Sequence, residues 1–268
     1  MVKRIGLIAG NGRFPIIFAQ GAGKKGVEIV AIGINEETSK ELEKFVNKMY
    51  WLGAGELEKL LKILKEENIH SVVMAGQVKH RLLFDNSIKI DRKMQFLLGG
   101  LKNKKTDSII GAVARLLEFS GIKVLSSITF LSEHLPERGV LTKALPDERQ
   151  LKDIEFGRKI AKAIAGLDLG QSIVVKDMVV LAVESIEGTD EAIRRAAKYG
   201  NEGVVVVKVT KPKQDMRFDV PVVGPDTIKL LHEVRAACLA IEAKKTLIID
   251  KEETIRIADE AGIAIVAV

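Results

Sequence analysis

Short apolar runs alternate with longer segments of helical spacing through the first half of this 268-residue chain. Strand-length runs occupy Arg4–Ala9, Val27–Ile32, Ser71–Ala75 and Lys123–Ser126. The segments of helical spacing between them are Pro15–Lys24, Glu36–Asn47, Glu56–Glu66 and Asp107–Phe119. Strands separated by helices of about ten or more residues are typical of βαβ units, in which the strands run parallel. The first half is therefore predicted to be a Rossmann-like α/β domain built on a parallel sheet.

A change of pattern near residue 130 predicts a second domain. Residues 130–150 combine prolines and glycine with mixed charges, as linkers and interdomain loops do. Beyond them, Ser172–Glu184 is nearly continuous strand sequence broken at Lys176-Asp177, which predicts a bent strand or a hairpin. Further predicted elements are strands at Val204–Val209, Thr246–Ile249 and Ile263–Val268 and helices at Asp147–Ala165, Glu191–Tyr199, Asp226–Ala237 and Glu252–Ala261. We expect an N-terminal domain over residues 1–130 and a second α/β domain, with a mixed sheet, over residues 131–268.

Composition excludes several classes of protein. A hydrophobic fraction of 47% is too high for a disordered chain, and no apolar run approaches the roughly 20 residues of a membrane-spanning helix. Met1-Val2-Lys3-Arg4 leads straight into a strand-like run, so no signal peptide is expected. Cys238 is the single cysteine and the four histidines show no ligand spacing, which excludes a disulfide framework and disfavours zinc. A cytoplasmic protein is therefore expected.

The positive charge of the chain is concentrated in its first half. Residues 1–125 contain 21 Lys and Arg against 13 Asp and Glu, whereas residues 126–268 contain 21 against 23. A cluster of cations lies between Gly76 and Lys105: Lys79, Arg81, Lys89, Arg92, Lys93, Lys102, Lys104 and Lys105. This cluster is either a solvated face or a surface for an anionic ligand or an anionic membrane. Nucleic acid is disfavoured, because aromatic residues are not interleaved with the cations.

Two glycine turns follow predicted strands of the first half. Gly10-Asn11-Gly12-Arg13 precedes a predicted helix, whose free amides and the Arg13 guanidinium suit a phosphate. Gly76-Gln77-Val78-Lys79 ends another strand and would face the same crevice, since parallel strands meet ligands at their carboxyl ends. Either turn can equally be a tight structural connection. Pro15 stands where a dinucleotide fingerprint needs its third glycine, so that motif is not matched.

The second half carries an acidic segment after its predicted hairpin. Glu184, Glu187 and Asp190 place three carboxylates within seven residues of a strand end. Thr189 is a good N-cap, and Asp190 complements the dipole of the helix that follows, so helix capping alone explains part of this pattern. It leaves Glu184 and Glu187 as candidates for binding.

A longer mixed-charge loop follows the Val-rich strand. Asp215 and Asp219 lie four residues apart, and carboxylates of this kind hold Mg²⁺ or Mn²⁺ through hard oxygen atoms. The cations around them suit a phosphate group: Lys208, Lys211, Lys213 and Arg217. The loop therefore suits phosphoryl chemistry, with a salt-bridged surface loop as the alternative.

Taken in order, the motifs resemble those of a known family. The matching segments are Gly10-Asn11-Gly12-Arg13-Phe14-Pro15, Ala75-Gly76-Gln77-Val78-Lys79, Glu187-Gly188-Thr189-Asp190, a segment from Lys211 through Gln214-Asp215-Met216-Arg217-Phe218-Asp219 to Pro221 and Gly224, and Thr246-Leu247-Ile248 with Asp250. The chain resembles the UDP-2,3-diacylglucosamine pyrophosphatase family that occurs in bacteria lacking the metallophosphoesterase-type enzyme. The resemblance covers essentially the whole chain, and the segment around Asp215 and Asp219 is its most specific part.

The resemblance implies a Mg²⁺-dependent enzyme of lipid A synthesis, with Mn²⁺ as an alternative metal. It would hydrolyse the diphosphate of its substrate to UMP and 2,3-diacylglucosamine 1-phosphate, with the lipid product held between a Rossmann-like domain and a catalytic C-terminal domain. The family's essential Asp matches Asp219, with Asp215 as second choice, and Glu187 joins them as an expected metal ligand. Expected substrate contacts are Gly10, Asn11, Gly12, Arg13, Gly76, Gln77, Lys79, Glu187, Gly188, Thr189, Asp190, Lys208, Lys211, Gln214 and Arg217.

Further expectations concern location and the reaction. A diacylated substrate resides in a bilayer, so contact with the inner face of the inner membrane is expected, and a homodimer is left open. Attack is expected at the phosphorus next to the sugar, on the assumption that Asp219 lies in the second domain and the Gly10–Arg13 turn in the first. Two rival functions remain. An NAD(P)-dependent oxidoreductase needs an acidic residue after the second strand, where Asn35-Glu36 stands, and a non-catalytic nucleotide-binding regulator would bind without turnover.

Overall fold

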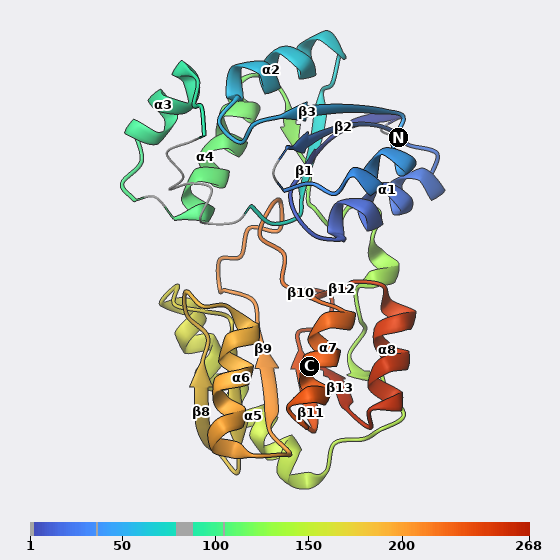
Figure 1. The fold of residues 1–268 in the computed structure, drawn as a ribbon, viewed down its shortest axis with the longest axis vertical. Coiled ribbons are helices and arrows are strands. Elements are labelled where there is room, and N and C mark those ends of the chain that lie inside the picture. The colour runs from blue at the N-terminus through green and yellow to red at the C-terminus, as the bar shows by residue number, and fades with distance from the viewer. Residues whose placement is uncertain (1–2, 36, 79–87, 104) are drawn as a thin grey trace. The chain divides into compact units, whose positions relative to one another are not determined.

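The computed structural model describes residues 3–35, 37–78, 88–103 and 105–268. The chain divides into two compact units, drawn in Figure 1. Unit 1 comprises Met1–Leu131 together with Asp215–Asp219, and unit 2 comprises Ser132–Gln214 and Val220–Val268. No helix among the described residues is long and apolar enough to cross a membrane.

Unit 1 is built on a parallel sheet, as predicted. Its strands are β1 (Arg4–Ala9), β2 (Glu28–Ile34), β3 (Lys48–Leu52), β4 (Ser71–Ala75) and β5 (Lys123–Val124), in the spatial order β3-β2-β1-β4-β5. The helices α1 (Phe14–Lys24), α2 (Leu57–Glu66) and α4 (Thr106–Phe119) connect these strands. Each adjacent pair of strands is parallel, so all five carboxyl ends lie at one edge of the sheet. A parallel order of this kind is the Rossmann arrangement.

Three elements of unit 1 differ from the prediction. The predicted α-helix at Glu36–Asn47 is wrong over its described part, residues 37–47, where the chain forms a short 3-10 helix, η1 (Lys40–Phe45). Ser39 caps η1 by accepting a hydrogen bond from the Glu41 amide. Strand β3, which was not predicted, pairs with β2 over Lys48–Leu52. The additional helix α3 (Arg92–Gly99) also lies in a segment for which no element was predicted.

Unit 2 is built on a mixed sheet of six strands within the described residues, in the order β6-β13-β11-β9-β7-β8. The parallel strands are β9 (Val205–Lys208), β11 (Cys238–Ile241) and β13 (Ala264–Ala267), and β6 (Gly139–Val140) runs antiparallel to β13. β7 (Ser172–Lys176) and β8 (Val179–Val183) form a hairpin turning at Asp177 and Met178, both with positive φ. The predicted mixed sheet is therefore confirmed.

Helices cover both faces of the unit 2 sheet. Helix α5 (Glu148–Gly166) packs on one face, and α6 (Thr189–Gly200), α7 (Pro225–Glu233) and α8 (Lys251–Glu260) pack on the other. Asp147 and Gln150 close a capping box at the start of α5. The short strands β10 (Val222–Val223) and β12 (Leu247–Ile248) form a separate parallel pair. Buried residues of β7, β9, β11 and β13 alternate between the two faces, so these strands contribute to two apolar cores.

The segment Asp215–Asp219 packs with unit 1, although unit 2 precedes and follows it in the chain. The Ser127 amide donates to the Met216 carbonyl over 2.9 Å, and the Ser127 hydroxyl donates to the Arg217 carbonyl over 2.6 Å. The Ser127 hydroxyl also reaches the carbonyl of Met74, the penultimate residue of β4. The expectation that Asp219 lies in the second domain is therefore wrong, because backbone hydrogen bonds fasten this segment to unit 1.

Candidate active site

The two predicted glycine turns of unit 1 lie against each other at the carboxyl edge of the sheet. The Asn11 amide donates to the Gln77 carbonyl over 2.7 Å, and the Gln77 amide donates back to the Asn11 carbonyl over 3.1 Å. The Gly10 amide donates to the Ala75 carbonyl over 2.8 Å. The structure thus brings Gly10, Asn11, Gly76 and Gln77 together, but the Gly10 and Asn11 amides are already used. They are not available to a phosphate group.

The close approach of these turns explains two of the glycines without a ligand. A Cβ atom on Gly10 would lie 2.4 Å from the Gln77 carbonyl oxygen, and one on Gly76 would lie 2.6 Å from the Asn11 carbonyl oxygen. Gly12 differs, because no protein atom lies within 4 Å of where its Cβ would be. Its φ of +90° favours glycine, and it stands exposed beside Arg13, the N-cap of α1. Gly12 and Arg13 are therefore the part of the turn best placed for an anion.

Glu37 is a residue of this site that the sequence analysis missed. The Asn11 side-chain amide donates to Glu37 Oε2 over 2.8 Å, and the Glu37 residue is only 6% exposed. Its Oε1 is buried and has no hydrogen-bond partner among the described residues. The next residue, Thr38, donates its hydroxyl to the Ala9 carbonyl, which ties the end of β2 to the end of β1. The acidic residue was sought at Glu36, one position away and outside the described residues.

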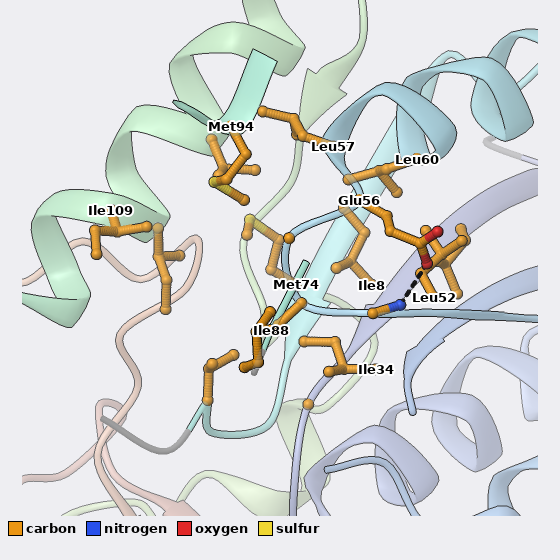
Figure 2. A pocket seen from close by; sticks show the side chains of 18 of the residues that line it. Ile8, Ile34, Leu52, Glu56, Leu57, Leu60, Met74, Ile88, Met94 and Ile109 are labelled. Carbon is orange, nitrogen blue, oxygen red and sulfur yellow. Dashed lines mark hydrogen bonds between the residues drawn. The ribbon is translucent and has the colours of Figure 1, made fainter. Parts of the chain in front are cut away.

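An apolar cavity of about 450 Å³ opens at the carboxyl ends of β1 to β4. Figure 2 shows its walls, where Leu60 of α2, Met94 of α3 and Ile109 of α4 stand over the strand residues Ile8 and Met74. Gly10 and Gly76 also line it. Such a volume falls within the range of about 300–1,000 Å³ found for pockets that bind small molecules. The sequence did not reveal this cavity, because each lining residue has the pattern of an ordinary core residue.

One charged group lies among the apolar lining residues that the structure describes. It is Glu56, whose Oε2 accepts a hydrogen bond from the Gly53 amide over 2.7 Å, drawn as the dashed line in Figure 2. This contact turns the carboxylate toward the backbone after β3. Apart from Glu56 and Thr106, the described lining side chains are apolar, so the cavity suits an apolar ligand.

The segment Asp215–Asp219 forms part of the cavity wall through Phe218. Both Asp215 carboxylate oxygens accept hydrogen bonds from the Arg217 guanidinium, whose Nη1 also donates to Glu118 over 2.6 Å. The hydrogen bonds from Arg217 lower the pKa of Asp215 below its usual range. Asp215 is therefore engaged in shaping the segment. Asp219 directly follows the lining residue Phe218 in the chain.

The candidate residues of unit 2 gather at one end of its mixed sheet, where β8 and β9 end and α6 begins. Lys208 donates to the Thr189 hydroxyl over 3.0 Å, and Thr189 donates to Glu184 over 2.8 Å. Gly188, with a φ of +87°, is the N-cap of α6 in place of the predicted Thr189. The Thr189 hydroxyl is used instead to link β8 and β9. The structure thus brings Thr189, Lys208 and Glu184 together.

Other predicted residues of unit 2 have partners of their own. Glu187 is paired with Arg195 over 2.5 Å, and Asp190 lies exposed in the first turn of α6. The Lys211 ammonium lies 3.0 Å from an Asp168 oxygen, and its amide donates to Gln214 Oε1 over 2.6 Å. These contacts define the conformation of the chain that leads from β9 toward Asp215.

A network that the sequence analysis missed lies at the same end of the sheet. Lys162 of α5 is paired with Glu242, which follows β11, over 2.7 Å. The Thr210 amide and hydroxyl both donate to Glu242. Burial by itself raises the pKa of Glu242, but the hydrogen bonds from Lys162 and Thr210 together hold it below its usual range. Glu242 gave no signal in the sequence, because its partners are 32 and 80 residues away.

The expected metal ligands do not form a cluster. Within the described residues, no group of three or more His, Cys, Asp and Glu side chains is placed to hold a metal ion. Asp215 is paired with Arg217 and Glu187 with Arg195. Lys79 of the predicted substrate contacts lies outside the described residues, as do Arg81 and Lys104 of the basic cluster.

Comparison with known proteins identifies the family. The model of the LpxI N-terminal domain matches residues 4–134, and the model of the LpxI C-terminal domain matches residues 137–266. The chain belongs to the LpxI family. A relative from Caulobacter vibrioides (strain ATCC 19089 / CIP 103742 / CB 15), named "UDP-2,3-diacylglucosamine pyrophosphatase LpxI", is 30% identical and is aligned over 100% of this chain and 98% of its own length. The resemblance drawn from the sequence motifs is thereby confirmed.

Solved structures offer only a distant likeness. The biotin carboxylase domain of a thermophilic 2-oxoglutarate carboxylase is 16% identical with a TM-score of 0.31, and covers 65% of this chain and 35% of its own. The biotin carboxylase subunit of pyruvate carboxylase is 15% identical with a TM-score of 0.29, and covers 74% of this chain and 42% of its own. This LpxI-family chain therefore spans well under half of those structures.

Proposed function

We propose that this protein hydrolyses the diphosphate of UDP-2,3-diacylglucosamine to UMP and 2,3-diacylglucosamine 1-phosphate, a step of lipid A biosynthesis. The observation that carries the proposal is the apolar cavity of unit 1, which lies between the glycine turns and the segment Asp215–Asp219. A substrate with acyl chains and a diphosphate needs hydrocarbon walls beside charged groups, and this edge of the sheet supplies both. The full-length similarity to a pyrophosphatase of this specificity supports the assignment.

Each candidate residue takes a role that its surroundings support. The cavity holds acyl chain, and Gly12 and Arg13 bind phosphate at the start of α1. Lys208, Lys211, Thr189 and Gln214 of unit 2 stay phosphate ligands predicted from the sequence resemblance. Asp219 is the catalytic carboxylate, because the sequence resemblance matches it to the family's essential Asp and it directly follows Phe218 of the cavity wall. Asp215 and Arg217 act as positioning residues that fix the segment on unit 1.

Magnesium dependence belongs to the same proposal. Mg²⁺ is commonly bound through one or two carboxylates together with substrate phosphates, so a cluster of three protein ligands is not required. Asp219 is the residue we assign to it, and the diphosphate oxygens would complete its coordination. A bound Mg²⁺ would neutralise phosphate charge and make water a better nucleophile. EDTA should abolish turnover and added Mg²⁺ or Mn²⁺ should restore it, whereas full activity after exhaustive chelation would contradict this assignment.

The position of Asp219 also indicates which phosphorus is attacked. Phe218 lines the cavity, so its neighbour Asp219 stands next to the acylated end of the substrate. Water is then directed at the phosphorus beside the sugar. A P–O bond to water forms, the bond to the UMP oxygen breaks, and UMP departs with the electron pair while water loses its proton. Attack at this phosphorus was expected from the sequence with Asp219 in the second domain, and it is proposed here with Asp219 in unit 1.

Hydrolysis in ¹⁸O-labelled water tests the function and the geometry together. The masses of the two products should be those of UMP and lipid monophosphate, with the label in the lipid monophosphate. Label in UMP would reverse the placement of the two substrate ends while leaving the hydrolase assignment intact. Absence of both products would remove the assignment. Retention of NAD(P) by the purified protein, or nucleotide binding without turnover, would then support the rival oxidoreductase or regulator.

Location and assembly are further parts of the proposal. The diacylated substrate resides in a bilayer, so we place the protein in the cytoplasm at the inner face of the inner membrane. Charge reversal at Lys102, Lys104 and Lys105 should weaken binding to anionic vesicles with little effect on detergent-solubilised substrate. A homodimer stays a prediction, which sedimentation of the intact chain tests.

A further inference from the structure

Helix α3 presents two different faces. Met94 is only 8% exposed and, with Leu98, lines the apolar cavity. Phe96, between them in sequence, is 87% exposed. Figure 1 shows α3 at the outer edge of unit 1, beyond α4 and away from the central strand β1. This short helix therefore separates the cavity from solvent while exposing a large aromatic side chain.

Exposed cations lie on α3 and in the segments that flank it in the chain. We use "the α3 face" for these exposed residues: Lys89, Ile90, Arg92, Lys93, Phe96, Lys102 and Lys105. The acidic residue within the stretch, Asp91, is occupied by backbone groups, since it accepts hydrogen bonds from the Met94 amide over 2.8 Å and the Glu58 amide over 2.6 Å. The α3 face is therefore positive, with Phe96 and Ile90 as its apolar members.

We propose that the α3 face docks on an anionic lipid bilayer, with Phe96 inserted among the acyl chains and the cations at the headgroups. Amphipathic helices with basic and aromatic residues bind membranes in this way. The proposal rests on the proposed function, because a diacylated substrate must pass from the bilayer into the cavity behind α3. Helix α3 forms part of the cavity wall, so docking through α3 shortens the path along which the acyl chains are exposed to water.

The composition of the α3 face favours a bilayer over a protein partner. Two exposed apolar side chains do not make the contiguous apolar centre of a protein interface, and lysine is depleted in such interfaces. Lysine and arginine beside a single aromatic residue match a surface of phosphate headgroups over hydrocarbon. The same chemistry would attract a nucleic acid, so the test includes single-stranded RNA as a competitor.

Phe119 provides a matched control for Phe96. It is 91% exposed, ends α4, and belongs to the same unit. Helix α4 has 14 residues, so Phe119 lies roughly 20 Å along it from the start near Lys105. Tryptophan placed at either position, with Trp51→Phe to remove the native signal, reports insertion directly. With vesicles of phosphatidylcholine and phosphatidylglycerol, Phe96→Trp should shift its emission to shorter wavelength and be quenched by brominated acyl chains, whereas Phe119→Trp should do neither.

Vesicle co-sedimentation measures how strongly each variant binds the bilayer. Phe96→Ala and Lys93→Glu should each weaken partitioning onto anionic vesicles about tenfold, and Phe119→Ala should leave it unchanged. Phe96→Ala and Lys93→Glu should both hydrolyse detergent-solubilised substrate at the wild-type rate. Equal emission shifts at residues 96 and 119, equal binding to pure phosphatidylcholine vesicles, or loss of vesicle binding to competing RNA would overturn the proposal. Vesicle binding with these signatures but without hydrolysis would leave docking in place and reject the proposed function instead.

Discussion

The two units differ in the side chains that stand at the carboxyl ends of their parallel strands. In unit 1, the carboxyl ends of β1 to β4 border a cavity of hydrocarbon side chains with Glu56 as the charged member among the described lining residues. In unit 2, the carboxyl ends of β9 and β11 carry a network of Lys162, Thr210 and Glu242. The carboxyl ends of parallel strands are where ligands bind in such sheets, and the two units differ in the polarity of the side chains at these ends.

The segment Asp215–Asp219 connects the two kinds of surface. It leaves the polar end of the unit 2 sheet after Lys211 and Gln214, and it is fastened to unit 1 by Ser127 and Glu118. Asp219, the carboxylate that we propose as catalytic, thereby belongs to unit 1, although the chain that leads to it comes from unit 2. Substitutions in the segment, in the unit 1 cavity and in the unit 2 network test these three parts separately.

The largest effect is expected at Asp219. Asp219→Asn should lower kcat by about 10³-fold, equivalent to about 4 kcal/mol of barrier, because the catalytic carboxylate is removed. The thermal midpoint should be unchanged. Asp215→Asn should instead release Arg217, lowering both the thermal midpoint and activity. Steady-state kinetics and thermal unfolding of the two variants, measured side by side, distinguish the roles. Wild-type turnover in Asp219→Asn would transfer the catalytic role to Asp215.

Filling the cavity of unit 1 should produce the next largest effect. Ile109→Phe places extra volume among Met94, Met74 and Ile88, so long acyl chains should lose contact with the walls. Each methylene excluded from an apolar site costs about 0.8 kcal/mol, or roughly fourfold, so loss of three or four should raise KM roughly 100-fold.

Substrate length provides the control for this variant. A substrate with shorter acyl chains should show a much smaller difference between Ile109→Phe and the wild type, because it does not reach the filled region. An equal loss for long and short chains would mean that the cavity does not hold the acyl group.

A smaller effect is expected from the network of unit 2. Lys162→Met leaves the Glu242 carboxylate without its ammonium partner, which should cost about 2 kcal/mol and lower the thermal midpoint by several degrees. Activity should fall roughly tenfold, since Thr210 begins the chain that leads to Asp215. The double variant Lys162→Met with Glu242→Gln should recover much of the stability. Glu187→Gln, which removes an ion pair with the half-exposed Arg195, should scarcely change stability.

How far the sequence predicts this molecule depends on how local each signal is. The parallel sheet and the turns at Gly10 and Gly76 follow from short patterns, because a strand and the glycine after it are adjacent in the chain. Strand β3 and helix α3 were missed, since β3 exists by pairing with β2 and α3 by covering the cavity. The spacing of apolar residues within a short segment cannot predict either the pairing of β3 with β2 or the packing of α3 over the cavity.

The site shows the same division. Asp215 and Asp219 could be recognised as candidates, but only the contact between Arg217 and Asp215 separates their roles. The cavity draws residues from Ile8 to Phe218, and the pair of Lys162 and Glu242 spans 80 residues, so neither leaves a local signal. Glu37 was missed by a single position, because a loop after β2 offers several acidic residues and only the fold turns one toward Asn11.

The smallest expected effect concerns Glu67, whose carboxylate lies at the end of the unit 1 sheet opposite the cavity. A substitution there tests stability separately from catalysis. Glu67 accepts hydrogen bonds from Lys48 and Tyr50, each over 2.5 Å, and from Arg4 over 2.7 Å. These contacts lower the pKa of Glu67 from 4.5 to about 2. A carboxyl group whose pKa is lowered by folding stabilises the protein above its unfolded pKa, and that contribution is lost as pH falls. Glu67→Gln should therefore be less stable than the wild type at pH 7, and the difference should shrink between pH 4.5 and 2. Urea unfolding of both proteins across this range measures it, with the neighbouring, exposed Glu66→Gln as control. A difference in unfolding free energy that stays constant at every pH would show that Glu67 acts through packing alone. Hydrolysis at pH 7 should be unchanged in Glu67→Gln, since Glu67 lies at the end of the sheet opposite the cavity.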